Sequence, residues 1–395
     1  MTRTAIISVD GHVKASLKGY RGYVDPGLRE RYDEYVSAME EAGTTDPSNV
    51  RPEYGLESQW DTAARQTALE AKGVVAEVLF PNGIPFQLNP FDDHARVADP
   101  ELEHAGRWAY NRWLADFCAD LPQQRSGQAF ISFEDVEQGV RDVEWAKEHG
   151  LGGVMLPIPS PRMFFDPELD PIWAACRDSD MTVTQHGGIG DEYTPPGFAA
   201  LMTIAIESAF YSNRSLWQLI VGGVFDRFPE LRVAFIETQL MFIMPAIRKL
   251  DEEFTQGTEL LEFAAFLGRE RCFEKSAAEY FASNCFVGVS PFSPRQLPLD
   301  ELVGKDAAER PLPGFHVGAH NAMFGVDYPH FESIYRTTLD EVTGLVGHPS
   351  VTSDDAQRIL FDNALEVFRF DRDALAPHIE RVGFDLDEVC SPASA

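Results

Sequence analysis

The feature that most constrains the fold is a regular alternation of short apolar segments with helical stretches. Eight segments have the length and composition of buried strands: 5–9, 74–80, 126–132, 152–156, 181–185, 232–236, 285–289 and 323–326. Helical patterns lie between and after them, over 61–72, 100–120, 135–149, 171–179, 198–225, 240–265 and 352–368. Strands that alternate with helices favour a parallel sheet, and eight such units are what a closed (β/α)8 barrel requires. We therefore expect an α/β fold, a TIM barrel.

The length of the chain, 395 residues, suits one such barrel with insertions. We expect the barrel domain to span 1–370 and a C-terminal tail to span 371–395. Helical insertions are expected after strands five, six and seven. The loops 13–60, 187–215 and 290–322 are expected to face the substrate, because barrel enzymes build their active sites from loops that follow the strands.

Acidic residues dominate the charge of the chain, with 63 Asp and Glu against 33 Lys and Arg and a net charge of −30. Such a surface repels phosphate backbones and anionic lipid headgroups, so we expect neither nucleic acid nor a membrane as a partner. We expect no export signal, because no charged and then apolar stretch is seen ahead of the first strand. Five cysteines without a C-x-x-C pair are typical of reduced thiols. We expect a cytoplasmic protein that acts on a small molecule.

Three of the apolar segments end in residue types that bind metals. Asp10 and His12 follow the first segment, His186 the fifth and Asp327 the eighth. Because the C-terminal ends of barrel strands meet at one mouth, these four side chains are expected to converge. Two carboxylates and two imidazoles suit one divalent ion, zinc first and manganese second. The alternative for each residue taken alone is a turn or a packing role, since Asp-Gly is an ordinary turn sequence.

Further polar residues lie near the same mouth. Asp327 is a candidate proton carrier as well as a ligand, because a carboxylate beside a metal-bound water can take its proton. Asn82 follows the second strand and is a candidate for contacting the substrate. His330, just past Asp327, is a candidate for orienting the ligands or contacting the substrate. Glu237 follows the sixth strand, and three roles are open for it: a general base, an added metal ligand, or the partner of an arginine such as Arg65 or Arg232.

These motifs resemble the amidohydrolase superfamily, and within it the amidohydrolase-related group that includes aminocarboxymuconate-semialdehyde decarboxylase and resorcylate decarboxylases. The segments that carry the resemblance are 10–12, 186–188, 324–330, 110–117, 225–232 and 363–364. The resemblance covers most of residues 5–370. It implies a barrel that binds one divalent metal, commonly zinc or manganese, through the positions of Asp10, His12, His186 and Asp327.

One position departs from that family. Many members carry a histidine at the end of strand six, in a phrase like V-I-F-S-H-G-G, and that histidine helps to activate water or protonate the substrate. The corresponding phrase here is Val233–Gln239, V-A-F-I-E-T-Q, and Glu237 takes the place of the histidine. This departure counts against a simple transfer of the decarboxylase mechanism.

Our first hypothesis is a metal-dependent hydrolase of a small, carboxylated or aromatic substrate, with Asp327 moving the proton and Glu237 assisting. The alternative is a non-oxidative decarboxylase of an aromatic or unsaturated acid, in which Asp327 protonates the carbon that loses CO₂. A barrel that has lost catalysis is a third alternative. The resemblance and the long insertions also lead us to expect a homodimer or a higher homo-oligomer.

Overall fold

The computed structural model describes residues 3–42, 56–87, 99–187, 198–254, 259–268, 273–289, 298–330 and 333–389. One sheet of eight parallel strands forms its centre, and the strands are ordered in the sheet as they are in the chain. They are β2 (Ile6–Val13), β3 (Val74–Pro81), β4 (Arg125–Phe130), β5 (Gly153–Met155), β6 (Thr182–Gln185), β7 (Val233–Ile236), β8 (Cys285–Val289) and β9 (Ala322–Phe324). This confirms the expected α/β TIM-barrel fold.

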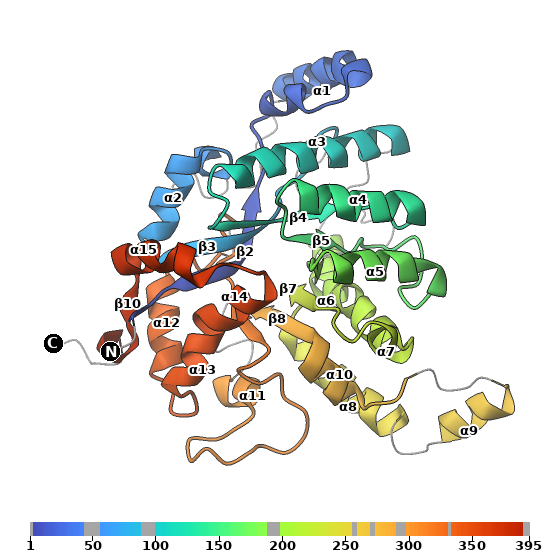
Figure 1. Cartoon of the computed structure of the whole chain (residues 1–395), viewed down its shortest axis with the longest axis vertical. Helices are drawn as coiled ribbons and strands as arrows, with labels where there is room; N and C mark the ends of the chain where they lie inside the picture. The colour runs from blue at the N-terminus through green and yellow to red at the C-terminus, as the bar shows by residue number, and fades with distance from the viewer. Residues whose placement is uncertain are drawn as a thin grey trace.

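Helices follow the strands and surround the sheet (Figure 1). They are α1 (Arg29–Ala42), α2 (Thr62–Glu70), α3 (Pro100–Ala119), α4 (Val136–Glu148), α5 (Asp170–Asp178), α6 (Phe198–Val221), α7 (Val224–Arg227), α8 (Leu240–Phe254), α9 (Glu259–Phe266), α10 (Ala277–Asn284), α11 (Leu299–Val303), α12 (Thr338–Val346), α13 (Ser353–Gln357), α14 (Asn363–Val367), α15 (Arg372–Val382) and α16 (Leu386–Val389). Side-chain hydrogen bonds to backbone amides explain where several of these helices begin. The Asp61 side chain accepts a hydrogen bond from the Ala64 amide at the start of α2, and Thr352 forms a capping box with Asp355 before α13.

The barrel closes between its first and last strands, β2 and β9, through few regular pairings. A single parallel bridge joins Gly11 to Tyr328. The His12 amide donates to the Tyr328 carbonyl at 2.8 Å, and the Asp327 amide donates to the Asp10 carbonyl at 2.9 Å. The closing seam therefore runs directly through the segments that carry three of the expected metal ligands.

An apolar cluster fills the inside of the barrel and continues into the C-terminal helices. Alternate residues along β2, such as Val9, belong to this cluster. Phe361, Val367 and Leu375, all at most 1% exposed, join it from the helical segment that begins at residue 353 and from α15. Thr182, at the start of β6, donates a hydrogen bond to the Val367 carbonyl. The C-terminal helices thus cover the N-terminal ends of the strands and leave the opposite mouth for the site.

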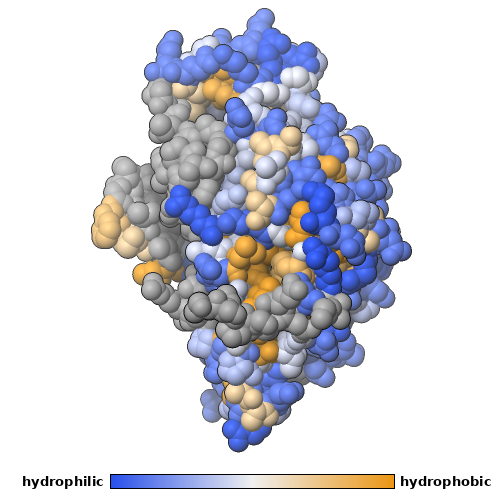
Figure 2. All heavy atoms as spheres, turned by 90° about the vertical axis from the view of Figure 1, so that its left-hand side faces the viewer, coloured by the Kyte–Doolittle hydropathy of each residue, from blue (hydrophilic) through white to orange (hydrophobic). Residues whose placement is uncertain are grey.

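The N- and C-terminal segments also meet. β1 (Arg3–Thr4) pairs antiparallel with β10 (Phe384–Asp385), which follows α15. Seen from the left-hand side of Figure 1, the surface is mainly hydrophilic, as the net charge of −30 leads one to expect, with apolar side chains gathered near the middle of the face (Figure 2). Within the described residues, no helix combines the length and the apolar composition needed to cross a membrane.

Two strand boundaries near the site and the insertion after β8 differ from the sequence-based expectation. β2 continues to Val13, so Asp10 and His12 lie inside the strand instead of after it. β9 ends at Phe324, two residues before the expected end. After β8 the described part of the insertion holds only the short helix α11, whereas long helices do follow β6 and β7. Strand ends depend on hydrogen bonds to neighbouring strands, which the local sequence pattern does not contain.

The buried amide of Asn363 secures the segment that leads into β9, because it donates to the carbonyls of Ala319 and Ala322, both at 2.7 Å. Asn363→Ala leaves these buried acceptors unsatisfied, and we expect the free energy of unfolding to fall by about 1–3 kcal/mol. Urea unfolding followed by circular dichroism measures this change. Glu366→Ala, at an exposed position of the same helix, is the control and is expected to stay within about 0.5 kcal/mol of the parent. Equal stability of Asn363→Ala and the parent would contradict the prediction.

Candidate metal centre

A β-bulge in β2 turns Asp10 and His12 toward the mouth of the barrel. Val9 belongs to the cluster inside the barrel, so unbroken alternation would point Gly11 inward and both Asp10 and His12 outward. The register between β2 and β3 shifts between Ser8 and Gly11, and an extra residue in one strand moves the following side chains to the opposite face. Asp10 and His12 are 0% and 2% exposed.

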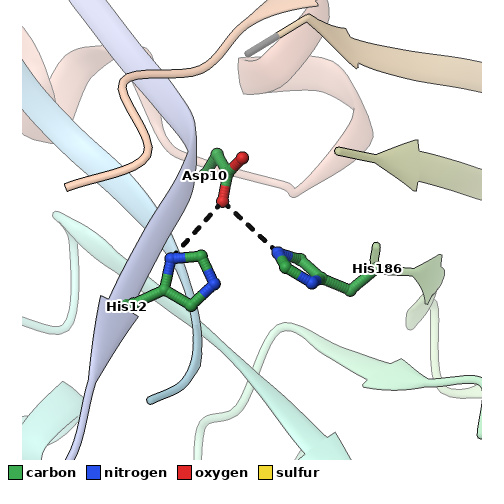
Figure 3. Close-up of side chains that lie close together, drawn as sticks. All are labelled: Asp10, His12 and His186. Carbon is green, nitrogen blue, oxygen red and sulfur yellow. Dashed lines mark hydrogen bonds and ion pairs between the residues drawn. The ribbon is translucent and has the colours of Figure 1, made fainter. Parts of the chain in front are cut away.

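His186 directly follows β6 and points at Asp10 (Figure 3). Its Nε2 lies 3.4 Å from Asp10 Oδ1, and its Nδ1 lies 3.3 Å from the Gly187 carbonyl. Asp10 Oδ1 also lies 3.7 Å from His12 Nδ1, so one carboxylate oxygen faces both imidazoles. The His186 side chain is 17% exposed, which makes it the most accessible of the three.

Asp327 joins these residues from the segment after β9. Its Oδ1 lies 3.2 Å from His12 Nδ1 and 3.0 Å from His330 Nδ1. Its backbone has a φ of +58°, in the left-handed region that non-glycine residues rarely adopt. Such a conformation persists only where the surroundings enforce it. One such restraint is the hydrogen bond that the Asp327 backbone amide donates to the Asp10 carbonyl. The four expected ligands therefore form a series of contacts, from His186 through Asp10 and His12 to Asp327.

The four side chains fit a divalent cation. Within the described part of the chain, Asp10 Oδ2, His12 Nδ1 and both carboxylate oxygens of Asp327 are buried without a hydrogen-bond partner. Neighbouring ligand atoms are 3.2–3.7 Å apart, close to the roughly 3.3 Å that separates ligands bound at 2.0–2.1 Å around tetrahedral zinc. Potential ligand atoms lie within 4.8 Å of one another in two overlapping groups, Asp10 with His12 and His186, and His12 with Asp327 and His330. A cation would satisfy these orphaned atoms.

Burial holds the pKa of His12 well below its ordinary value of 6.5, and the neighbouring His330 lowers it further against the opposing effect of Asp10. His12 is therefore neutral at physiological pH, and a neutral imidazole has a lone pair for a metal. Asp10 and Asp327 consequently receive no compensating positive charge from His12.

Glu237 directly follows β7 and lies close to the candidate ligands. Its Oε2 lies 3.6 Å from His186 Nε2, its side chain is 29% exposed, and its φ is +55°. The two arginines that the sequence offered as partners are engaged elsewhere, Arg65 with Glu77 and Arg232 with Asp180. Glu237 therefore stands beside the candidate metal ligands.

His330 and Asn82 lie side by side on the other flank of the centre. The His330 ring stacks on His12 with centroids 3.8 Å apart, and its Nε2 lies 3.4 Å from Asn82 Oδ1. The Asn82 amide donates to Gln59 Oε1 at 2.7 Å. A polar chain thus runs from Asp327 through His330 and Asn82 to Gln59, a residue that the sequence reasoning did not select.

The buried ion pair of Arg65 with Glu77 was also missed. Arg65 Nε lies 2.8 Å from Glu77 Oε1, and both side chains are at most 5% exposed. One signal was available, because Glu77 interrupts an otherwise apolar strand and a carboxylate at such a position requires a partner.

The lowered pKa of His12 predicts a pH dependence of stability in the metal-free protein. The unfolded chain binds a proton at His12 near pH 6.5, whereas the folded protein binds it only at lower pH. The free energy of unfolding should therefore fall as the pH drops below about 6.5, and His12 should contribute no slope above it. Urea unfolding at several pH values, compared with His12→Gln, isolates this contribution. Identical slopes for the two metal-free proteins would contradict the prediction.

Comparison with solved structures places the fold among known proteins. An amidohydrolase, map2389c of Mycobacterium avium subsp. paratuberculosis K-10, is 17% identical with a TM-score of 0.65, over 93% of this chain and 100% of that one. A dihydroxybenzoic acid decarboxylase of Polaromonas sp. JS666, with bound manganese and the inhibitor 2-nitroresorcinol, is 16% identical with a TM-score of 0.60, over 93% and 98%. A 5-carboxyvanillate decarboxylase of Novosphingobium aromaticivorans DSM 12444, with bound manganese, is 16% identical with a TM-score of 0.65, over 92% and 97%.

None of the curated protein sequences matches the chain significantly. At identities this low, the solved structures show a shared fold and no more. A family model described as Amidohydrolase (Amidohydro_2) matches residues 85–370, which is more than half of the 395-residue chain. The protein therefore belongs to this amidohydrolase family, as its motifs led us to expect.

Proposed function

We propose that the protein is a divalent-metal-dependent decarboxylase that removes CO₂ from an aromatic acid without oxidation. The observation that carries the proposal is the convergence of two buried carboxylates and two imidazoles at the mouth of the barrel. Support for this reaction class comes from the dihydroxybenzoic acid and carboxyvanillate decarboxylases that share the fold, both with bound manganese. They favour manganese over zinc as the first ion to test.

Asp10, His12, His186 and Asp327 would hold the cation, which when bound supplies a positive charge that withdraws electrons from a substrate oxygen. The remaining chemistry falls to the side chains. When the bond between the ring carbon and the carboxylate breaks, CO₂ leaves and the electron pair stays on the carbon. That carbon must then receive a proton, and Asp327 in its protonated form is the donor that the geometry offers.

His330 is placed to keep Asp327 in position and to return its proton. Its Nδ1 lies 3.0 Å from Asp327 Oδ1, while its Nε2 faces Asn82 Oδ1 at 3.4 Å. Stacking on His12 fixes the plane of the His330 ring. We therefore assign His330 and Asn82 to the substrate side of the centre, where they contact the substrate or orient Asp327.

Hydrolysis is the second candidate, and Glu237 favours it. Its carboxylate stands 3.6 Å from His186 Nε2, where it could accept a proton from an attacking water. In that reaction Glu237 acts as a general base and the substrate is an ester, a lactone or an amide. The first hypothesis from the sequence thus becomes the second candidate here, because the structural relatives favour decarboxylation.

The deciding experiment is a screen of the purified protein loaded with manganese or zinc. Aromatic acids are assayed for CO₂ release, and esters, lactones and amides for hydrolysis. CO₂ release that requires the metal supports the proposal. Hydrolysis without any CO₂ release would assign the second candidate, and a protein that binds well below one metal ion per chain would contradict both.

Asp327→Asn tests the proton donor. The amide keeps the shape of the side chain but cannot deliver an acidic proton, so we expect the turnover rate to fall by at least about 10²-fold. Circular dichroism and metal analysis check that the fold and the metal content persist. A variant with bound metal and parental turnover would remove Asp327 from the mechanism.

Glu237→Gln separates the two reactions. If the enzyme is a decarboxylase, the variant should keep its rate within a few-fold, since Glu237 transfers no proton in the proposed step. If the enzyme is a hydrolase, loss of the general base should lower the rate by about 10²–10⁴-fold. The rate of the variant on the best substrate from the screen is the measurement.

A further inference from the structure

Arg65 lies in α2, directly behind the metal-binding strand, and its side chain is wholly buried. Its guanidinium makes a forked pair with Glu77 on β3, with Nε at 2.8 Å from Oε1 and Nη2 at 2.8 Å from Oε2. Nη1 donates to the Ser58 carbonyl at 3.2 Å. A buried positive charge requires such partners. Glu77 and Ser58 nevertheless engage only three of the five N–H groups of the guanidinium.

The remaining donors of Arg65 reach the two strands that close the barrel. Nη1 donates to the His12 carbonyl at 3.1 Å, and Nη2 donates to the Tyr328 carbonyl at 3.4 Å. His12 is a candidate ligand, and Tyr328 directly follows the candidate ligand Asp327. The guanidinium also lies 5.3 Å from the centre of the Tyr328 ring. One side chain thus joins both sides of the closing seam.

Gly11, between Asp10 and His12, permits this approach. A Cβ atom at Gly11 would stand 3.0 Å from Arg65 Nη2 and 3.0 Å from Glu77 Oε2, closer than side chains normally pack. The glycine of the Asp-Gly-His motif therefore makes room for the ion pair against the back of the strand. This gives the motif a second role beside that of supplying ligands.

We propose that Arg65, held by Glu77, is a positioning residue that fixes the separation of Asp327 from Asp10 and His12, and thereby sets the affinity of the centre for its divalent metal. The proposal rests on the metal-dependent function proposed above. The seam has one regular bridge, so the guanidinium replaces ladder hydrogen bonds that β2 and β9 do not make with each other. Lysine cannot replace it, because an ammonium lacks the planar fork that serves Glu77 and two separate carbonyls at once.

The test compares Arg65→Lys with the parent and with Arg227→Lys. Arg227 makes the same kind of forked pair, with Asp170 at 2.9 Å for both bonds, and donates to the Gly222 carbonyl at 2.8 Å, outside the ligand-bearing segments. Titration calorimetry of the metal-free proteins with manganese gives the Kd, and thermal unfolding gives the Tm. We expect Arg65→Lys to weaken manganese binding by about 10–100-fold. Arg227→Lys should keep the parental Kd.

A lower Tm with an unchanged Kd for Arg65→Lys would overturn the proposal, since it would make the ion pair a structural one only. If Arg65→Lys does not fold, Glu77→Gln takes its place, because glutamine keeps the size of the side chain while it loosens the fork. Folded Glu77→Gln with the parental Kd would overturn the proposal as well. A parent that binds manganese yet fails the CO₂ screen refutes the proposed reaction alone, whereas a parent that binds neither manganese nor zinc refutes both proposals.

Discussion

Two almost fully buried carboxylates, those of Asp10 and Asp327, each approach His12 Nδ1 at the closing seam of the barrel, at 3.7 and 3.2 Å, and the need to compensate their charge governs the site. A buried carboxylate without a partner is too costly for a folded protein to retain. His12 lies between the two but stays neutral, because burial lowers its pKa. The charge of Arg65 is already matched by Glu77. Among the described residues the carboxylates thus keep unsatisfied oxygens at the centre, and a divalent cation is the partner whose charge and ligand geometry suit them.

The two ends of the barrel differ in role: one holds the packed core that stabilises the fold, and the other holds the buried carboxylates. The N-terminal ends of the strands are sealed by apolar side chains from the C-terminal helices, such as Phe361 and Leu375, so that end of the barrel holds a packed core. At the opposite end individual hydrogen bonds from the amides of His12 and Asp327 join β2 to the segment after β9. The bulge of β2 against β3 turns Asp10 and His12 inward at this same end. Barrel enzymes commonly divide the two ends in this manner.

The sequence was sufficient to predict the eight strands and the barrel. It also led us to expect Asp10, His12, His186 and Asp327 at one mouth, because strand ends in a parallel barrel meet there, and that they bind a metal stays a prediction. It could not predict how Asp10 and His12 come to face inward. That depends on a bulge between Ser8 and Gly11, which is a property of the pairing with β3 and not of β2 alone. Arg65, which the sequence offered as one possible partner of Glu237, pairs instead with Glu77, twelve residues along the chain. Long-range partners of this kind follow from the packing of α2 on the sheet.

The charge count at the centre connects Glu237 with the choice of reaction. Asp10, Asp327 and Glu237 bring three negative charges when all are ionised, and a divalent cation offsets two. A substrate that arrives as a carboxylate adds a fourth negative charge. In the proposed decarboxylation Asp327 is the proton donor and Glu237 transfers no proton, so Glu237 then contributes only its charge. In the hydrolysis of a neutral ester or amide Glu237 would be the general base. The carboxylate that directly follows β7 therefore affects the two reactions differently, because it repels an acidic substrate and offers a base to the water that attacks a neutral one.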